Sequence, residues 1–283
     1  MILVSSDSEL RSFFPNVFAS AAGEPSFFEK LLPHLEAAEA WISRFLVDLD
    51  EFSELPEPVA SPLKRLAVAL ALHAAAPQLD LALTANGFVT AGTPTAVPIS
   101  AERMRRLMRS LAFSADSAIS AALAHLHSVP EWCESPHGAF FAASLIQDPE
   151  AVTVVHAGAP SELPSELEAH PQFDRFLSMR QKALDLELII AEEFISPELM
   201  AEWRRRKLSR SLRVADIPLV SAVTTQLFTA LRGGCLNKRA LASIVGDIRN
   251  APEDFPEWHS SETSRLFNNH AFKNEKSAGG YFW

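Results

Sequence analysis

The chain is poor in cysteine, and this argues against a disulfide-stabilised fold. Cys133 and Cys235 are the only two cysteines among 283 residues, so the sequence predicts no disulfide framework and a reducing compartment. The first residues, MILVSSDSEL, turn polar after a few apolar positions, unlike a secretory signal peptide. No apolar run approaches the roughly 20 residues that a membrane span needs. We therefore expect a soluble, cytoplasmic protein with no membrane partner.

Glycine and tyrosine are also scarce, whereas phenylalanine is frequent. The chain has 10 glycines and 1 tyrosine against 19 phenylalanines, and 48% of its residues are hydrophobic. This composition suits a helical core packed from leucine, alanine and phenylalanine, either as one large core or as two smaller ones. The Ser-x-x-Glu spacing at Ser6–Glu9 and at Ser26–Glu29 is typical of helix starts. The sequence predicts a mainly α fold, a multi-helix bundle.

Positive charge is lacking in the first half of the chain. Residues 1–150 hold 9 Lys and Arg against 18 Asp and Glu, and residues 151–283 hold 16 against 17, for a total of −10. Affinity for nucleic acid comes largely from cations that neutralise phosphates. We therefore expect weak binding to duplex DNA.

The order of apolar patterns and prolines divides the chain into four predicted parts. These are an N-terminal helical lobe (1–128) with a β-hairpin within 79–99, a proline-rich connecting segment (129–170) with a short β arm at 151–156, a C-terminal helical lobe (171–270), and an aromatic tail (271–283). The two helical regions could form separate lobes that arose by duplication, although amphipathic helices resemble one another in any case.

The predicted hairpin has the clearest local signal. Asn86-Gly87 follows an alternating segment and precedes Phe88, and an Asn-Gly pair accepts the positive φ angles that a two-residue type I′ turn requires. Ser100 then begins a long helix. The sequence predicts that the turn protrudes and that Asn86, Gly87 and Phe88 contact a partner.

The same segment resembles a phage and prophage protein family of gut Bacteroidetes, whose members are described as head–tail connector-like neck proteins. The resemblance covers roughly the first half of the chain. The matching residues are Leu83, Thr84, Asn86, Gly87, Phe88, Pro98, Ser100, Arg103 and Leu107.

This resemblance implies a non-catalytic structural protein of the virion neck without a cofactor. Such an adaptor is assembled in the cytoplasm of the bacterial host and forms a ring, expected to be a dodecamer, between the portal protein and the tail or tail-completion protein. DNA would pass through the ring as cargo. The acidic balance of the chain suits a conduit that does not trap phosphates.

Four potential metal ligands offer an alternative from another class. His125, His127, Cys133 and His137 lie close together in the sequence, and zinc takes four such ligands. However, His125 and His127 are two positions apart on a predicted helix and point to different faces. A helical metal-binding protein or enzyme centred on residues 125–137 is therefore the alternative, and no bound metal is expected. A helical scaffold that binds a host regulator is a further possibility.

A basic run and an aromatic tail complete the predicted partner-binding residues. Arg204, Arg205 and Arg206 form the core of the basic run, which could be a solvated helix face or could meet an acidic protein or DNA. The tail ends in three aromatic residues, which bury large apolar areas when they dock. They could return to their own core; we expect them to anchor on a neighbouring subunit or ring partner. These residues are Tyr281, Phe282 and Trp283.

Overall fold

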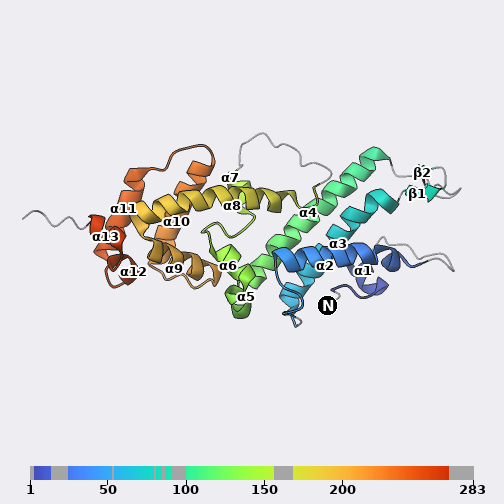
Figure 1. Ribbon diagram of the computed structural model, residues 1–283, viewed down its shortest axis with the longest axis horizontal. Helices are drawn as coiled ribbons and strands as arrows, with labels where there is room; N and C mark the ends of the chain where they lie inside the picture. Colours follow the sequence, from blue (N-terminus) through green and yellow to red (C-terminus); the bar gives the residue numbers. More distant parts are fainter. Residues whose placement is uncertain are drawn as a thin grey trace, which may run out of the picture.

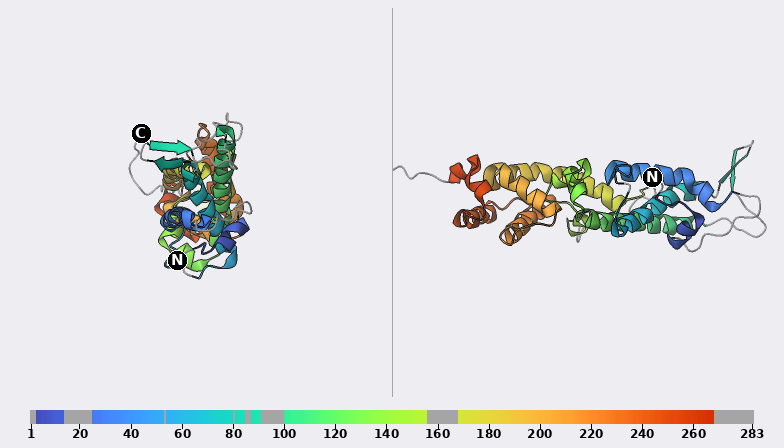
Figure 2. Two further views of the ribbon diagram at one scale, coloured as in Figure 1. Left: turned by 90° about the vertical axis from the view of Figure 1, so that its right-hand side faces the viewer. Right: turned by 90° about the horizontal axis from the view of Figure 1, so that it is seen from below.

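The computed structural model describes residues 3–13, 25–52, 54–79, 81–84, 87–90, 100–155 and 168–267. The elements in chain order are α1 (Asp7–Phe13), α2 (Phe27–Phe45), α3 (Glu57–Leu79), β1 (Leu81–Thr84), β2 (Gly87–Thr90), α4 (Ala101–Leu126), α5 (Pro130–Glu134), α6 (Pro136–Ala142), α7 (Ala151–Val155), α8 (Pro171–Ile190), the π-helix η1 (Ala191–Ile195), α9 (Pro197–Leu208), α10 (Asp216–Leu231), α11 (Lys238–Asn250), α12 (Pro256–His259) and α13 (Glu262–Phe267). The prediction of a mainly α-helical fold is therefore confirmed. The molecule is elongated, with β1 and β2 at one end and α13 near the other (Figure 1 and Figure 2).

The helices α2, α3 and α4 form the N-terminal part of the molecule, with α3 in contact with both others. Ser26 begins α2 as predicted, because its hydroxyl accepts the Glu29 N–H and the Glu29 carboxylate accepts the Ser26 N–H. Small residues in α3, such as Ala67 and Ala71, are fully buried. Their size lets the neighbouring helices approach closely and bury a continuous apolar core.

The apolar character of α3 also corrects the expectation about membrane spans. Residues 57–78 are long and apolar enough to cross a membrane by length and composition, yet 67% of the most apolar window is buried inside the protein. A helix that is hydrophobic on most sides is characteristic of a core position as well as of a membrane span. The contacts of α3 with α2 and α4 account for its composition.

The strands β1 and β2 pair antiparallel between α3 and α4, but in a different register from the predicted one. Thr84 pairs with Gly87 and Leu83 pairs with Phe88, so Gly87 belongs to β2 and is not a central turn residue. Asn86 lies outside the described residues.

The predicted β arm at 151–156 is wrong, because residues 151–155 form the short helix α7. The N–H groups of Ala151 and Val152 donate to the carbonyl oxygens of Asp148 and Pro149, over 3.1 Å in both cases. Val152 and Val155, three positions apart, are the buried members of this helix. Residues three positions apart share one face of a helix but would lie on opposite faces of a strand, so this burial pattern suits a helical turn.

The proline-rich segment also contributes large side chains to the core. Trp132 of α5 and Phe141 of α6 are fully buried. The Trp132 indole N–H donates to the carbonyl oxygen of Leu46 at 2.8 Å, and the Phe141 ring lies 6.2 Å from that of Phe176 in α8. The segment thus packs both against the end of α2, which precedes it in the sequence, and against α8, which follows it.

A buried carboxylate on α4 caps the start of α8. The Asp116 oxygens accept the N–H groups of Gln172 at 2.9 Å and Phe173 at 3.0 Å. The residue at the usual cap position, His170, makes no side-chain cap bond. Asp116 therefore satisfies N–H groups that a helix start leaves without an intrahelical partner.

The predicted long helix after Pro171 ends in a π-helical turn, η1, which the sequence pattern does not indicate. Ser196 follows it with φ 81°, a conformation that residues with a side chain rarely adopt. The freed carbonyl of Phe194 accepts the Trp258 indole N–H at 2.9 Å. This bond joins η1 to α12 and compensates for the interrupted helical hydrogen bonding.

Candidate functional site

The predicted basic run lies on α9, and most of its charge is used inside the chain. Arg204 pairs with the fully buried carboxylate of Glu187 in α8 at 2.8 Å. Ser144 donates its hydroxyl to the same carboxylate at 2.6 Å, and the Leu145 N–H donates at 2.9 Å. The Arg204–Glu187 pair thus ties α8 and α9 to the loop that follows α6.

Arg206 belongs to a second internal network. Its guanidinium pairs with Asp216 at 3.2 Å and with Glu257 at 2.8 Å. Asp216 also accepts the Trp203 indole N–H and two N–H groups of the Arg213 side chain, each at 3.0 Å. This network joins α9, α10 and α12.

The internal pairs reduce the charge that this run offers to another molecule, and its contact with a partner stays a prediction. The Arg204 and Arg206 side chains are 20% and 12% exposed, whereas Arg205 is 64% exposed and pairs with Glu202. The Lys207 ammonium donates to the Leu145 carbonyl at 2.5 Å, and burial lowers its pKa although Asp148 and Glu187 act in the opposite direction. Arg205 alone of the three predicted arginines points outward.

The pKa of Asp216 makes this second network sensitive to acid. Burial would raise that pKa, but the hydrogen bonds and charge of Arg213 together with the Trp203 bond lower it below the ordinary value of 3.8. A folded-state pKa below the unfolded one stabilises the fold above the unfolded pKa, and this contribution disappears as the pH falls through the folded pKa.

We expect Asp216→Asn to lower the free energy of unfolding at neutral pH, and the difference from the wild type to narrow below about pH 4. Urea unfolding of both proteins between about pH 2.5 and pH 7 measures this difference in the free energy of unfolding. Asp247→Asn, at an exposed position on α11, is the matched control. A difference that stays constant down to about pH 2.5 would show that the Asp216 charge does not stabilise the fold.

The structure does not bring the four potential metal ligands together. His127 is buried and stacks on Trp132 with ring centroids 5.6 Å apart, and the Cys133 thiol faces the His127 carbonyl at 3.6 Å. His137 contacts the Ser43 carbonyl at 2.9 Å, and His125 is exposed. Within the described ranges, no group of three or more His, Cys, Asp or Glu side chains is placed to hold a metal ion. Burial raises the pKa of the Cys133 thiol, which disfavours the reactive thiolate.

The other predicted partner residues fall largely outside the described structure. Gly87 and Phe88 lie in β2, at the end of the molecule where α3 ends (Figure 1). Asn86, Tyr281, Phe282 and Trp283 are not among the described residues. Their partner contacts stay predictions.

An exposed basic and aromatic face on α4 was not predicted from the sequence. Four arginines in its first turns are exposed, and Phe113, further along the helix, is 76% exposed. Arg106, Arg109 and Phe113 follow the i, i+3, i+7 spacing of one helix face. The negative charge summed over residues 1–150 concealed this face, which the local spacing of arginines indicates. The arginines are Arg103, Arg105, Arg106 and Arg109.

Comparison with known proteins gives one similarity. Residues 24–142 match a family of unknown function, DUF6712. The matched segment runs from the start of α2 to the end of α6, less than half of the chain. No curated protein and no solved structure matches the chain.

Proposed function

We propose that this chain is a non-catalytic structural protein of a phage neck, a head–tail adaptor. In this proposal it forms a dodecameric ring between the portal protein and a tail or tail-completion protein, through which DNA passes. The ring is assembled in the bacterial cytoplasm and resides in the virion. The β1–β2 hairpin protrudes from an N-terminal helical lobe, and the C-terminal helices form a second lobe.

Two features support a protein of this class. The segment from Leu83 to Leu107 resembles neck proteins in its residue pattern. The molecule is an elongated stack of helices (Figure 2), a shape that allows different partners to bind at different points along one subunit.

The observation that carries the proposal is the exposed face of α4 formed by Arg106, Arg109 and Phe113. The Phe113 ring, at 76% exposure, leaves a large apolar surface in water beside these arginines, and a subunit contact would bury it. Aromatic and arginine residues are also the types that contribute most to binding at protein interfaces. A neighbouring copy with a locally acidic surface would complement these exposed arginines. We therefore place a subunit contact on this face of α4.

The test is the mass of the purified protein in solution, measured by light scattering and native mass spectrometry. We expect a closed oligomer for the wild type, and Phe113→Ser is expected to weaken assembly by about 2 kcal/mol, or about 30-fold in the dissociation constant. Electron microscopy of the same sample shows whether the oligomer is a ring.

Leu266→Ser is the matched control, because Leu266 is 70% exposed on α13 but lies far from α4 (Figure 1). We expect it to leave the mass unchanged. A wild type that stays monomeric, alone and with portal protein, would contradict the ring proposal. Equal assembly of the wild type and Phe113→Ser would show that the subunit contact does not involve this face of α4.

A further inference from the structure

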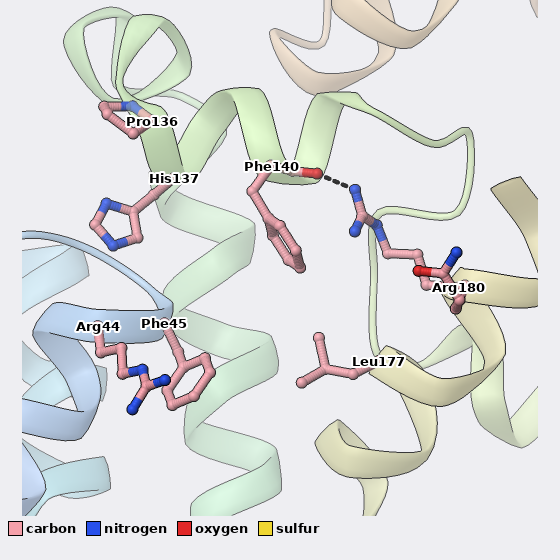
Figure 3. Close-up of a pocket in the computed structure, with 8 residues that line it drawn as sticks. Arg44, Phe45, Pro136, His137, Phe140, Leu177 and Arg180 are labelled. Carbon is pink, nitrogen blue, oxygen red and sulfur yellow. Dashed lines mark hydrogen bonds between the residues drawn. The ribbon is translucent and has the colours of Figure 1, made fainter.

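A cavity of about 470 Å³ opens between α2, α6 and α8. Figure 3 shows that Arg44 and Phe45 approach it from α2, across from residues of α6 and α8. No aspartate or glutamate is among the described residues that line it. The side chains that matter for its chemistry are Arg44, Phe45, His137, Phe140, Leu177 and Arg180.

Arg180 is the unusual residue of this cavity, because it is a buried cation that forms no ion pair with a described residue. The residue is 4% exposed, and no described carboxylate lies within ion-pair distance of it. Its guanidinium donates to the Phe140 carbonyl and lies 4.1 Å from the centre of the Phe140 ring. Its Nε is buried and has no hydrogen-bond partner among the described residues.

Such an arrangement is unfavourable for the empty protein. Taking a guanidinium out of water without an anion costs free energy that one hydrogen bond and one ring contact do not fully recover. Burial accordingly lowers the pKa of Arg180 to about 10, although Glu187 raises it and Arg204 lowers it further. Glu187 is engaged with Arg204, Ser144 and Leu145 and is not turned to the cavity.

The rest of the lining adds a second cation and an apolar wall. Arg44 is exposed at the rim, and its guanidinium lies 5.2 Å from the centre of the Phe45 ring. Phe140 is 43% exposed, and its ring faces the opening in Figure 3. Leu177 lies beside it from α8. Ligand pockets commonly combine such an apolar lining with a few polar groups that fix orientation.

We propose that this cavity binds a small organic anion, a carboxylate carried on an aromatic body. Arg180 holds the carboxylate, because a guanidinium binds a carboxylate through paired N–H donors. Arg44, at the other edge of the cavity in Figure 3, adds a second positive charge that attracts the anion. The aromatic body packs against Phe45, Phe140 and Leu177. The volume of about 470 Å³ accommodates a molecule of this size. This site is separate from the α4 face and does not depend on the neck proposal.

Isothermal titration calorimetry of the full chain tests the site with phenylacetate, with the neutral analogue phenylacetamide and with inorganic phosphate. We expect phenylacetate to bind with a dissociation constant below about 1 mM, and both other probes to bind at least about tenfold more weakly. Arg180→Met is expected to abolish phenylacetate binding. Arg175→Met, at an exposed position on the same helix, is expected to bind like the wild type.

Circular dichroism establishes that each variant is folded. If Arg180→Met fails to fold, Arg44→Met decides, because it removes the rim cation from an exposed position and is expected to weaken binding at least about tenfold. Failure of phenylacetate to bind at up to about 5 mM overturns the proposal, as does unchanged binding in the deciding variant. If phenylacetamide binds as tightly as phenylacetate, the site recognises the aromatic ring and not the carboxylate. This result also overturns the proposal.

Discussion

Glu187→Ala is expected to lower the free energy of unfolding by about 3–5 kcal/mol. The carboxylate is fully buried and accepts hydrogen bonds from Ser144, Leu145 and Arg204. Its removal leaves the Arg204 cation and the Leu145 N–H without their buried acceptor. An unpaired buried group costs more than a buried pair contributes. Urea unfolding followed by circular dichroism measures the change.

Glu102→Ala provides the matched control for this experiment. Glu102 pairs with Arg106 one helical turn away, and both side chains are largely exposed, at 69% and 75%. Exposed pairs of this kind contribute about 0.3–0.5 kcal/mol. Similar losses for the two variants would mean that the Glu187 network is no stronger than a surface ion pair.

Gly138→Ala is expected to destabilise the protein by at least about 3 kcal/mol. A Cβ atom at this position of α6 would lie 2.2 Å from the Trp132 carbonyl oxygen and 2.6 Å from that of Cys133. Both obstacles are backbone atoms, and they belong to α5, which Trp132 anchors in the core. The junction between the two short helices must therefore open to admit a methyl group. Thermal and urea unfolding report the loss.

Gly246→Ala is the control, because it is expected to raise the free energy of unfolding instead of lowering it. Gly246 lies within α11, and a Cβ atom there has no neighbour within 4 Å. Alanine is favoured over glycine inside a helix by about 0.5–1 kcal/mol. We expect this variant to be more stable than the wild type. Stabilisation by both substitutions would show that α5 and α6 are not as closely packed as the structure has them.

Features that depend on neighbouring residues were predictable from the sequence. The capping box at Ser26 and Glu29 satisfies helix N–H groups within three residues, so its pattern alone identifies the start of α2. The helical class follows from the same local patterns repeated along the chain. The π-helix η1 was not predictable from local patterns. It leaves the Phe194 carbonyl for a hydrogen bond from Trp258, which is distant in the sequence.

Contacts between residues that are distant in the sequence were not predictable. The arginines of α9 have a basic sequence pattern, but their acceptors Glu187 and Glu257 come from other helices. Arg180 belongs to no sequence motif. It is distinguished by its burial and by the lack of an ion pair with any described residue. The α4 face was concealed because net charge averages over a long segment, whereas a partner contacts only a local surface.

The Asp116 contact to α8 has a consequence for where a folding unit ends. The similarity to DUF6712 stops at residue 142, yet Asp116, inside the matched segment, holds the N–H groups of Gln172 and Phe173 beyond it. Phe141, near the boundary, packs on Phe176 in the same way. A fragment trimmed to the matched residues would expose both groups, so we expect it to be less stable than the full chain.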